Sequence, residues 1–84
     1  MIRVTARIGG LGSLKRVEAR TFALPDGTTL EQFLATLTLQ FGEEVSHPSV
    51  LVAVNGRAVL QPDRAETVLQ EGDVVSVVRG FAGG

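Results

Sequence analysis

The sequence predicts an α+β fold in which a mixed sheet of four to five strands packs against one main helix. Three observations support this prediction. Apolar and polar residues alternate along residues 2–8, an apolar stripe with helical spacing follows at residues 30–41, and three valine-containing apolar segments come after it. The order of elements is strand, strand, helix, strand, short strand, strand. Short connections favour the β-grasp arrangement, with the final strand in the middle of the sheet beside the first.

The first strand has the period-two pattern of a half-buried strand, but the second is less regular. The second strand is expected over residues 16–24. Within it, Phe22 and Leu24 fall on the face opposite Val17. A bulge near residues 19–20 would reconcile the two faces.

The helix carries the strongest local signals in the chain. Thr28 followed three residues later by Glu31 matches a capping box, so the helix is expected to begin here. Gly42 stands where a left-handed cap would end the helix. The apolar residues between these ends are expected to pack in the core rather than to form a partner-binding face; they are Leu30, Phe33, Leu34, Leu37 and Phe41.

The second half of the chain reads as a hairpin followed by a final strand. Residues 50–54 form a continuous apolar run typical of an inner strand, and Asn55-Gly56 follows as a hairpin turn. A short return strand is expected at residues 57–60, with one helical turn around residues 65–68. The last strand covers residues 74–79, after a tight turn.

The composition excludes several classes of function. The chain has no cysteine and one histidine, which excludes a disulfide scaffold, a thiolate metal site and a cysteine nucleophile, so no metal site is expected. A net charge of −1, with scattered charges, gives no patch for nucleic acid. Apolar runs fall far short of the ~20 residues that span a membrane, so a cytoplasmic location without membrane contact is expected. His47, in a polar loop, is expected to be solvent-exposed rather than catalytic.

The carboxyl-terminal residues carry the most specific functional signal. Residues 1–79 are expected to form the domain, and residues 80–84 a flexible tail that ends in Gly83-Gly84. Because glycine has no side chain, such a tail fits a narrow channel and leaves the terminal carboxylate open to an activating enzyme.

Three segments of the sequence resemble the ubiquitin-like sulfur carriers of the MoaD/ThiS family. They are the Val-Asn-Gly turn within residues 52–56, the Gly-Asp-x-Val turn and strand within residues 67–75, and the terminal Gly83-Gly84. Residues 81–84 are most similar to the ending of the molybdopterin synthase small subunit. Residues 77–80 are more similar to the thiamin-pathway carriers.

The resemblance implies that Gly84 is the reactive residue and that Gly83, Ala82 and Phe81 are needed for its activation. Because a phenylalanine in the tail has no core to enter, Phe81 is expected to be an anchoring contact with a partner. An E1-like enzyme that uses ATP and Mg²⁺ would adenylate the Gly84 carboxylate. Sulfur from a sulfurtransferase or a cysteine desulfurase would then convert it to a thiocarboxylate. The chain would be a carrier and not an enzyme, with no catalytic residue and no bound cofactor. Molybdopterin biosynthesis is the favoured pathway, with the large subunit of molybdopterin synthase as a partner.

A partner surface is expected on the last strand. If Val75 and Val77 face the helix, the alternate valines point outward and form an exposed apolar patch beside the tail. The opposite register remains open from the sequence, because this strand is apolar on both faces. Two arginines on the outer side of the first strand would border the patch. The candidate partner surface therefore consists of Val74, Val78, Arg3 and Arg7.

Other functions remain open from the sequence. Thiamin and other thio-metabolites are alternative sulfur acceptors. The same carboxyl group could be conjugated to lysines, as in a ubiquitin-like modifier, although Lys15 is the only lysine and this disfavours chains built on the protein itself. A non-covalent β-grasp binding module would keep its function without Gly83-Gly84, whereas a carrier or a modifier would lose it.

Overall fold

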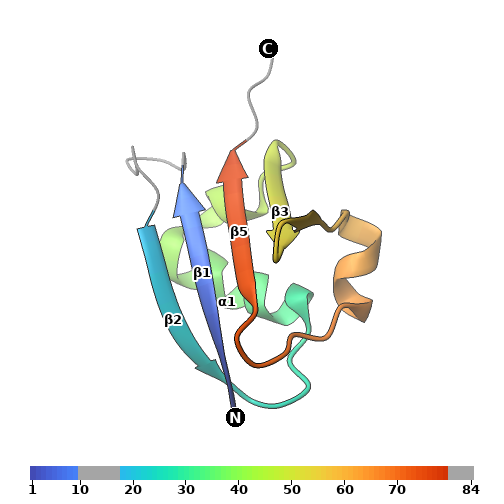
Figure 1. The fold of residues 1–84 in the computed structure, drawn as a ribbon. Helices are drawn as coiled ribbons and strands as arrows, with labels where there is room; N and C mark the ends of the chain where they lie inside the picture. Colours follow the sequence, from blue (N-terminus) through green and yellow to red (C-terminus); the bar gives the residue numbers. More distant parts are fainter. Residues whose placement is uncertain (10–17, 80–84) are drawn as a thin grey trace.

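The computed structural model describes residues 1–9 and 18–79. The strands are β1 (Ile2–Gly9), β2 (Glu18–Leu24), β3 (Val50–Val54), β4 (Arg57–Ala58) and β5 (Val74–Arg79), and the helices are α1 (Leu30–Phe41) and the 3-10 helices η1 (Glu43–Ser46) and η2 (Gln61–Glu66). The five strands form one mixed sheet in the order β2-β1-β5-β3-β4, and α1 lies across one face of it (Figure 1). β1 and β5 pair in parallel at the centre, and the other neighbours are antiparallel. This is the β-grasp arrangement that the sequence predicts, with the final strand beside the first.

The core lies between α1 and the sheet face that it covers. Alternate residues of β1 and β5 point toward α1, and the apolar stripe of the helix packs on them. Val75 and Val77 are fully buried, which fixes the orientation of β5. The largest fully buried side chains are Phe33, Ile8, Leu30, Leu37, Leu69, Val4, Val75 and Val77.

β2 pairs with β1 without the expected bulge. The register is continuous from Ile2 opposite Leu24 to Ile8 opposite Glu18, so the predicted bulge is wrong. Phe22 faces the core, where its ring centroid lies 5.3 Å from that of Phe33 in an edge-to-face contact. The inward positions nearer the start of β2 are charged, because they lie at the end of the core. Arg20 covers the Phe41 ring at 5.0 Å there.

α1 begins one residue later than the sequence pattern suggests. Its N-cap is Thr29, whose hydroxyl accepts a hydrogen bond from the Gln32 backbone N–H, while the Gln32 side-chain oxygen accepts from the Thr29 N–H. The capping box predicted from Thr28 is therefore wrong by one residue. The Thr28 hydroxyl instead donates to the Pro25 carbonyl (2.7 Å) in the preceding turn. The helix ends at Gly42, as the sequence predicts, but the predicted left-handed cap is wrong, because φ of 99° and ψ of 171° lie outside that conformation.

β3 and β4 form the predicted hairpin. Asn55 (φ 52°) and Gly56 (φ 82°) both adopt left-handed backbone, as a type I′ turn requires. The return strand is shorter than the expected residues 57–60, because β4 ends at Ala58. The chain then enters η2, which replaces the helical turn expected around residues 65–68.

A hydrogen-bond network joins this hairpin turn to the start of β5. Asn55 Nδ2 donates to Asp73 Oδ1 (2.9 Å), and the Val74 N–H donates to Asn55 Oδ1 (2.9 Å). Asp73 Oδ2 also accepts from the Gln70 N–H (2.8 Å). The Val-Asn-Gly and Gly-Asp-x-Val motifs of the sequence therefore meet in space. They have a structural role, which is to fix the start of β5 beside the hairpin.

Replacing Asn55 with glycine is expected to lower the free energy of unfolding by about 1–2 kcal/mol. Glycine keeps the left-handed backbone of the turn but removes both side-chain hydrogen bonds of this residue. Urea unfolding of the variant and of the wild-type chain measures the difference. An unchanged free energy of unfolding would show that the network does not stabilise β5.

Candidate partner-docking surface

β5 presents alternate residues to the sheet face opposite α1. Because Val75 and Val77 face the core, Val74, Ser76 and Val78 lie on the outer face, and each is half-buried. This is the orientation on which the predicted partner surface depends. The opposite register, which the sequence left open, is not the one adopted.

β3 extends this face with a residue that the sequence pattern did not reveal. Leu51 lies opposite Val78, and Ala53 lies opposite Ser76. Leu51 is 61% exposed, so it adds a large apolar side chain to the surface. We call Leu51, Ala53, Ser76 and Val78 the outer patch. The continuous apolar run of β3 concealed Leu51, because a run without alternation does not say which residues face outward.

The four residues predicted as a partner surface fall into two neighbourhoods. Val78 is part of the outer patch, and Arg7, which is exposed and is the register partner of Ser76, borders it. Val74 lies at the other end of β5. Arg3 lies there too, with its Nε 3.6 Å from a carboxylate oxygen of Glu71. Arg3 therefore belongs to the turn before β5 and does not lie beside Val78.

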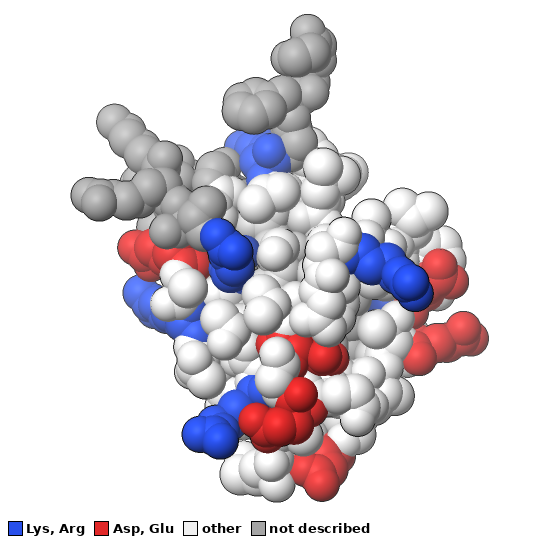
Figure 2. Space-filling model, in the orientation of Figure 1, with Lys and Arg blue, Asp and Glu red and all other residues white. Residues whose placement is uncertain are grey.

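The outer patch is uncharged, and charged side chains lie around it. Figure 2 shows an uncharged surface over β5 and β3, with basic side chains on both sides and acidic ones nearer the start of β5. Within residues 1–9 and 18–79, no group of three or more histidine, cysteine or acidic side chains could hold a metal ion. No helix in the same part of the chain is long and apolar enough to cross a membrane.

His47 lies on the surface, as expected, but it has a contact that the sequence reasoning missed. Its Nδ1 lies 2.7 Å from Ser49 Oγ and also accepts a hydrogen bond from the Ser49 backbone N–H (3.0 Å). The spacing of two residues makes this a local turn contact. Among the described residues no carboxylate contacts the imidazole, so the pair lacks the orienting acid of a nucleophile–base site.

The predicted reactive tail lies beyond the end of β5. Gly84, Gly83, Ala82 and Phe81 fall outside the described residues. Gly84 lies six positions after Val78, so its α-carbon is at most about 22 Å from that of Val78. A partner seated on the outer patch therefore has the carboxyl group within reach of a nearby active site.

Known proteins provide a comparison for this geometry. The model of the ThiS family matches residues 11–84, and no curated protein matches the chain. A putative molybdopterin converting factor subunit 1 from Pyrococcus furiosus has a TM-score of 0.75 and 22% identity, over 96% of this chain and 100% of that chain.

Two further solved structures are similar. One belongs to the complex of subunits 1 and 2 of molybdopterin-converting factor from Helicobacter pylori, with a TM-score of 0.67 and 24% identity over 99% of this chain and 100% of that chain. The other is the thiamine biosynthesis protein ThiS from Geobacter metallireducens, with a TM-score of 0.59 and 20% identity over 95% of this chain and 97% of that chain. At these identities, the neighbours establish the shared fold.

Proposed function

We propose that this chain, which belongs to the ThiS family, is a sulfur carrier whose reactive group is the carboxyl group of Gly84. The observation that carries the proposal is the Gly83-Gly84 ending in a family match that runs through residue 84. The outer patch also supports the proposal. It is an apolar surface on β5, the strand that leads to this ending, and on the neighbouring strand β3. The chain is the substrate of its partners, which supply the catalytic side chains.

The proposed chemistry has two steps at Gly84. A carboxylate oxygen attacks the α-phosphate of ATP, held with Mg²⁺ by an E1-like enzyme, and pyrophosphate leaves. Sulfur then attacks the carbonyl carbon of the acyl-adenylate, and AMP leaves with the electron pair of the broken C–O bond. Hydrosulfide gives the thiocarboxylate directly. A persulfide on a sulfurtransferase or a cysteine desulfurase first gives an acyl disulfide, which a second thiol cleaves.

The described part of the chain contributes docking to this chemistry. An activating enzyme must hold the domain while the tail enters its active site, so it needs a surface at a fixed distance from Gly84. The outer patch, with Arg7 at its border, is the surface nearest in sequence to the tail that is both exposed and apolar. A few residues that become fully desolvated supply most of the binding free energy in a protein interface.

Molybdopterin biosynthesis is the pathway that we propose for the sulfur. Two structural neighbours are subunits of molybdopterin converting factor, and one of them was solved together with the second subunit. The Phe81-Ala82-Gly83-Gly84 ending favours the same pathway. We infer that a large synthase subunit is the acceptor-side partner. The thiamin pathway is the alternative, because ThiS is also a structural neighbour.

The intact mass of the protein isolated from its own cells tests the proposal. We expect a species whose mass is higher by the difference in atomic mass between sulfur and oxygen, and fragmentation should map this difference to Gly84. Oxidation of Met1 adds nearly the same mass and must be excluded. If only the carboxylate is found, the cognate adenylating enzyme, ATP and a sulfur source should generate the thiocarboxylate. Failure with an enzyme shown to be active would reject the carrier function.

A further inference from the structure

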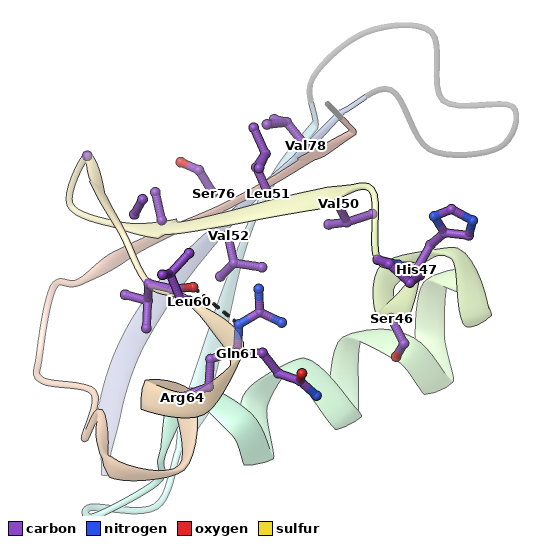
Figure 3. Close-up of a pocket in the computed structure, with 15 residues that line it drawn as sticks. Ser46, His47, Val50, Leu51, Val52, Leu60, Gln61, Arg64, Ser76 and Val78 are labelled. Atoms are coloured by element: carbon purple, nitrogen blue, oxygen red, sulfur yellow. Dashed lines mark hydrogen bonds between the residues drawn. The ribbon is translucent and has the colours of Figure 1, made fainter. Parts of the chain in front are cut away.

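A groove with a volume of ≈ 540 Å³ lies beside β3, where the hairpin partner β4 ends (Figure 3). Its walls come from β3, from η2 and from the segment between η1 and β3. Most of the lining is apolar. The groove includes the outer patch, because Leu51, Ala53, Ser76 and Val78 all line it.

The edge of β3 is only partly covered in this groove. The Val59 N–H donates to the Val52 carbonyl (2.9 Å), which is the last hydrogen bond of the hairpin ladder. The Val59 carbonyl would accept from Val52 if the ladder continued, but it accepts from Arg64 Nε instead (3.3 Å). Across residues 1–9 and 18–79, nothing pairs with the Val52 N–H or the Val50 carbonyl, and both residues line the groove.

The two unpaired groups have the spacing at which an added strand can pair with the edge of β3. They belong to Val50 and Val52, on either side of Leu51, and both point away from β5. In a parallel pair, one residue of the added strand lies opposite Leu51. Its N–H donates to the Val50 carbonyl, and its carbonyl accepts from the Val52 N–H. In an antiparallel pair, the same carbonyl and N–H bond to two residues of the added strand that lie two positions apart, so the free groups of Val50 and Val52 accept a strand in either direction.

Arg64 adds a positive charge to this groove. Its bond to the Val59 carbonyl holds the half-buried guanidinium between η2 and β3, as Figure 3 shows. No salt bridge joins Arg64 to an acidic residue in the described part of the chain. Glu31 lines the adjoining hollow with Arg64 but does not pair with it. The remaining guanidinium N–H groups are therefore available to a carboxylate.

We propose that this groove binds an extended segment of a partner protein, which pairs with the edge of β3 and carries an aspartate or glutamate that pairs with Arg64. Hydrogen bonds to Val50 and Val52 hold the segment at the edge of β3, and the carboxylate sets its specificity. Leu60, which is 70% exposed at the rim of the groove, contacts an apolar side chain of the segment. The proposal does not rest on the activation of Gly84, although the groove shares Leu51, Ala53, Ser76 and Val78 with the outer patch.

A random dodecapeptide library displayed on phage, selected against the folded chain, tests the proposal. Enriched peptides are expected to share an acidic residue among β-branched ones. Arg64→Gln is expected to weaken binding of the synthetic peptide at least about tenfold, because it removes the charge partner. Arg64→Lys keeps the charge without the planar fork and should retain part of the affinity. Arg57→Gln is the matched control. Arg57 is an exposed arginine of β4 that does not line the groove, so this variant should bind the peptide like the wild type.

The Val52 amide gives a second readout that is specific to strand addition. Its hydrogen exchange, followed by NMR, is expected to slow when the peptide binds, because the N–H gains an acceptor. The proposal is overturned if no peptide is enriched or if the enriched peptides lack an acidic residue. Equal affinity of the wild-type and Arg64→Gln chains, or unchanged exchange at Val52 in the complex, would overturn it as well.

Discussion

Deletion of Gly83 and Gly84 is expected to reduce thiocarboxylate formation to background in a reaction with the adenylating enzyme, ATP and a sulfur source. The deletion moves the carboxyl group to Ala82, two residues nearer the domain, so it no longer reaches the α-phosphate. Misplacement by even one ångström costs about 100-fold in rate, and two residues span roughly 7 Å. Intact mass spectrometry of the product measures the effect.

Two controls separate activation from docking in this experiment. A chain extended by one serine after Gly84 keeps both glycines but moves the carboxyl group, and it should be equally inactive. The deleted chain keeps the outer patch, so it should inhibit activation of the wild-type chain competitively. Normal activation of the deleted chain would mean that Gly84 is not the reactive residue.

Replacing Leu51 with aspartate is expected to lower kcat/KM for activation at least about 30-fold, which corresponds to a loss of about 2 kcal/mol of binding. Leu51 is the most exposed residue of the outer patch and lies opposite Val78. The substitution places a charge in an apolar contact, where it must be desolvated without a partner. Steady-state kinetics with the adenylating enzyme measures the effect.

The chain offers a matched control for this substitution. Leu39 is 89% exposed on α1, on the other side of the sheet from the outer patch. Leu39→Asp introduces the same charge at the same kind of residue and should leave kcat/KM within about twofold of the wild-type value. Equal losses in the two variants would point to a general effect of charge or stability and not to docking at the outer patch.

The features that the sequence predicts well are those with local physical causes. The stripe from Leu30 to Phe41 predicts α1, and Asn55-Gly56 predicts the hairpin, because a helical period and a type I′ turn each depend on neighbouring residues alone. The sequence leaves open which face of β5 is buried, and the structure buries Val75 and Val77. Pairing with the neighbouring strands and packing against α1 decide which face of β5 is buried. A strand that is apolar on both faces does not reveal this orientation in its sequence.

The features that the sequence does not reveal depend on distant contacts. Phe22 faces inward because the register with β1 is continuous, although the charged residue Arg20 then also faces inward. Arg20 is accommodated there by Phe41, which lies 21 positions later in the chain. The groove lies where the hairpin ladder ends, and there the Val59 carbonyl accepts a hydrogen bond from Arg64 Nε, five positions later in the chain.

The central place of β5 also affects when the domain can form during synthesis. β5 separates the β2-β1 pair from the β3-β4 hairpin, and it is the last strand of the described fold. A ribosome-bound chain can form the two outer halves of the sheet early, but the core closes only after residues 74–79 have emerged. Incomplete chains therefore expose unpaired edges and leave Val78 and Leu51 apart. Assembly of the outer patch is thus a marker of a completely synthesised domain.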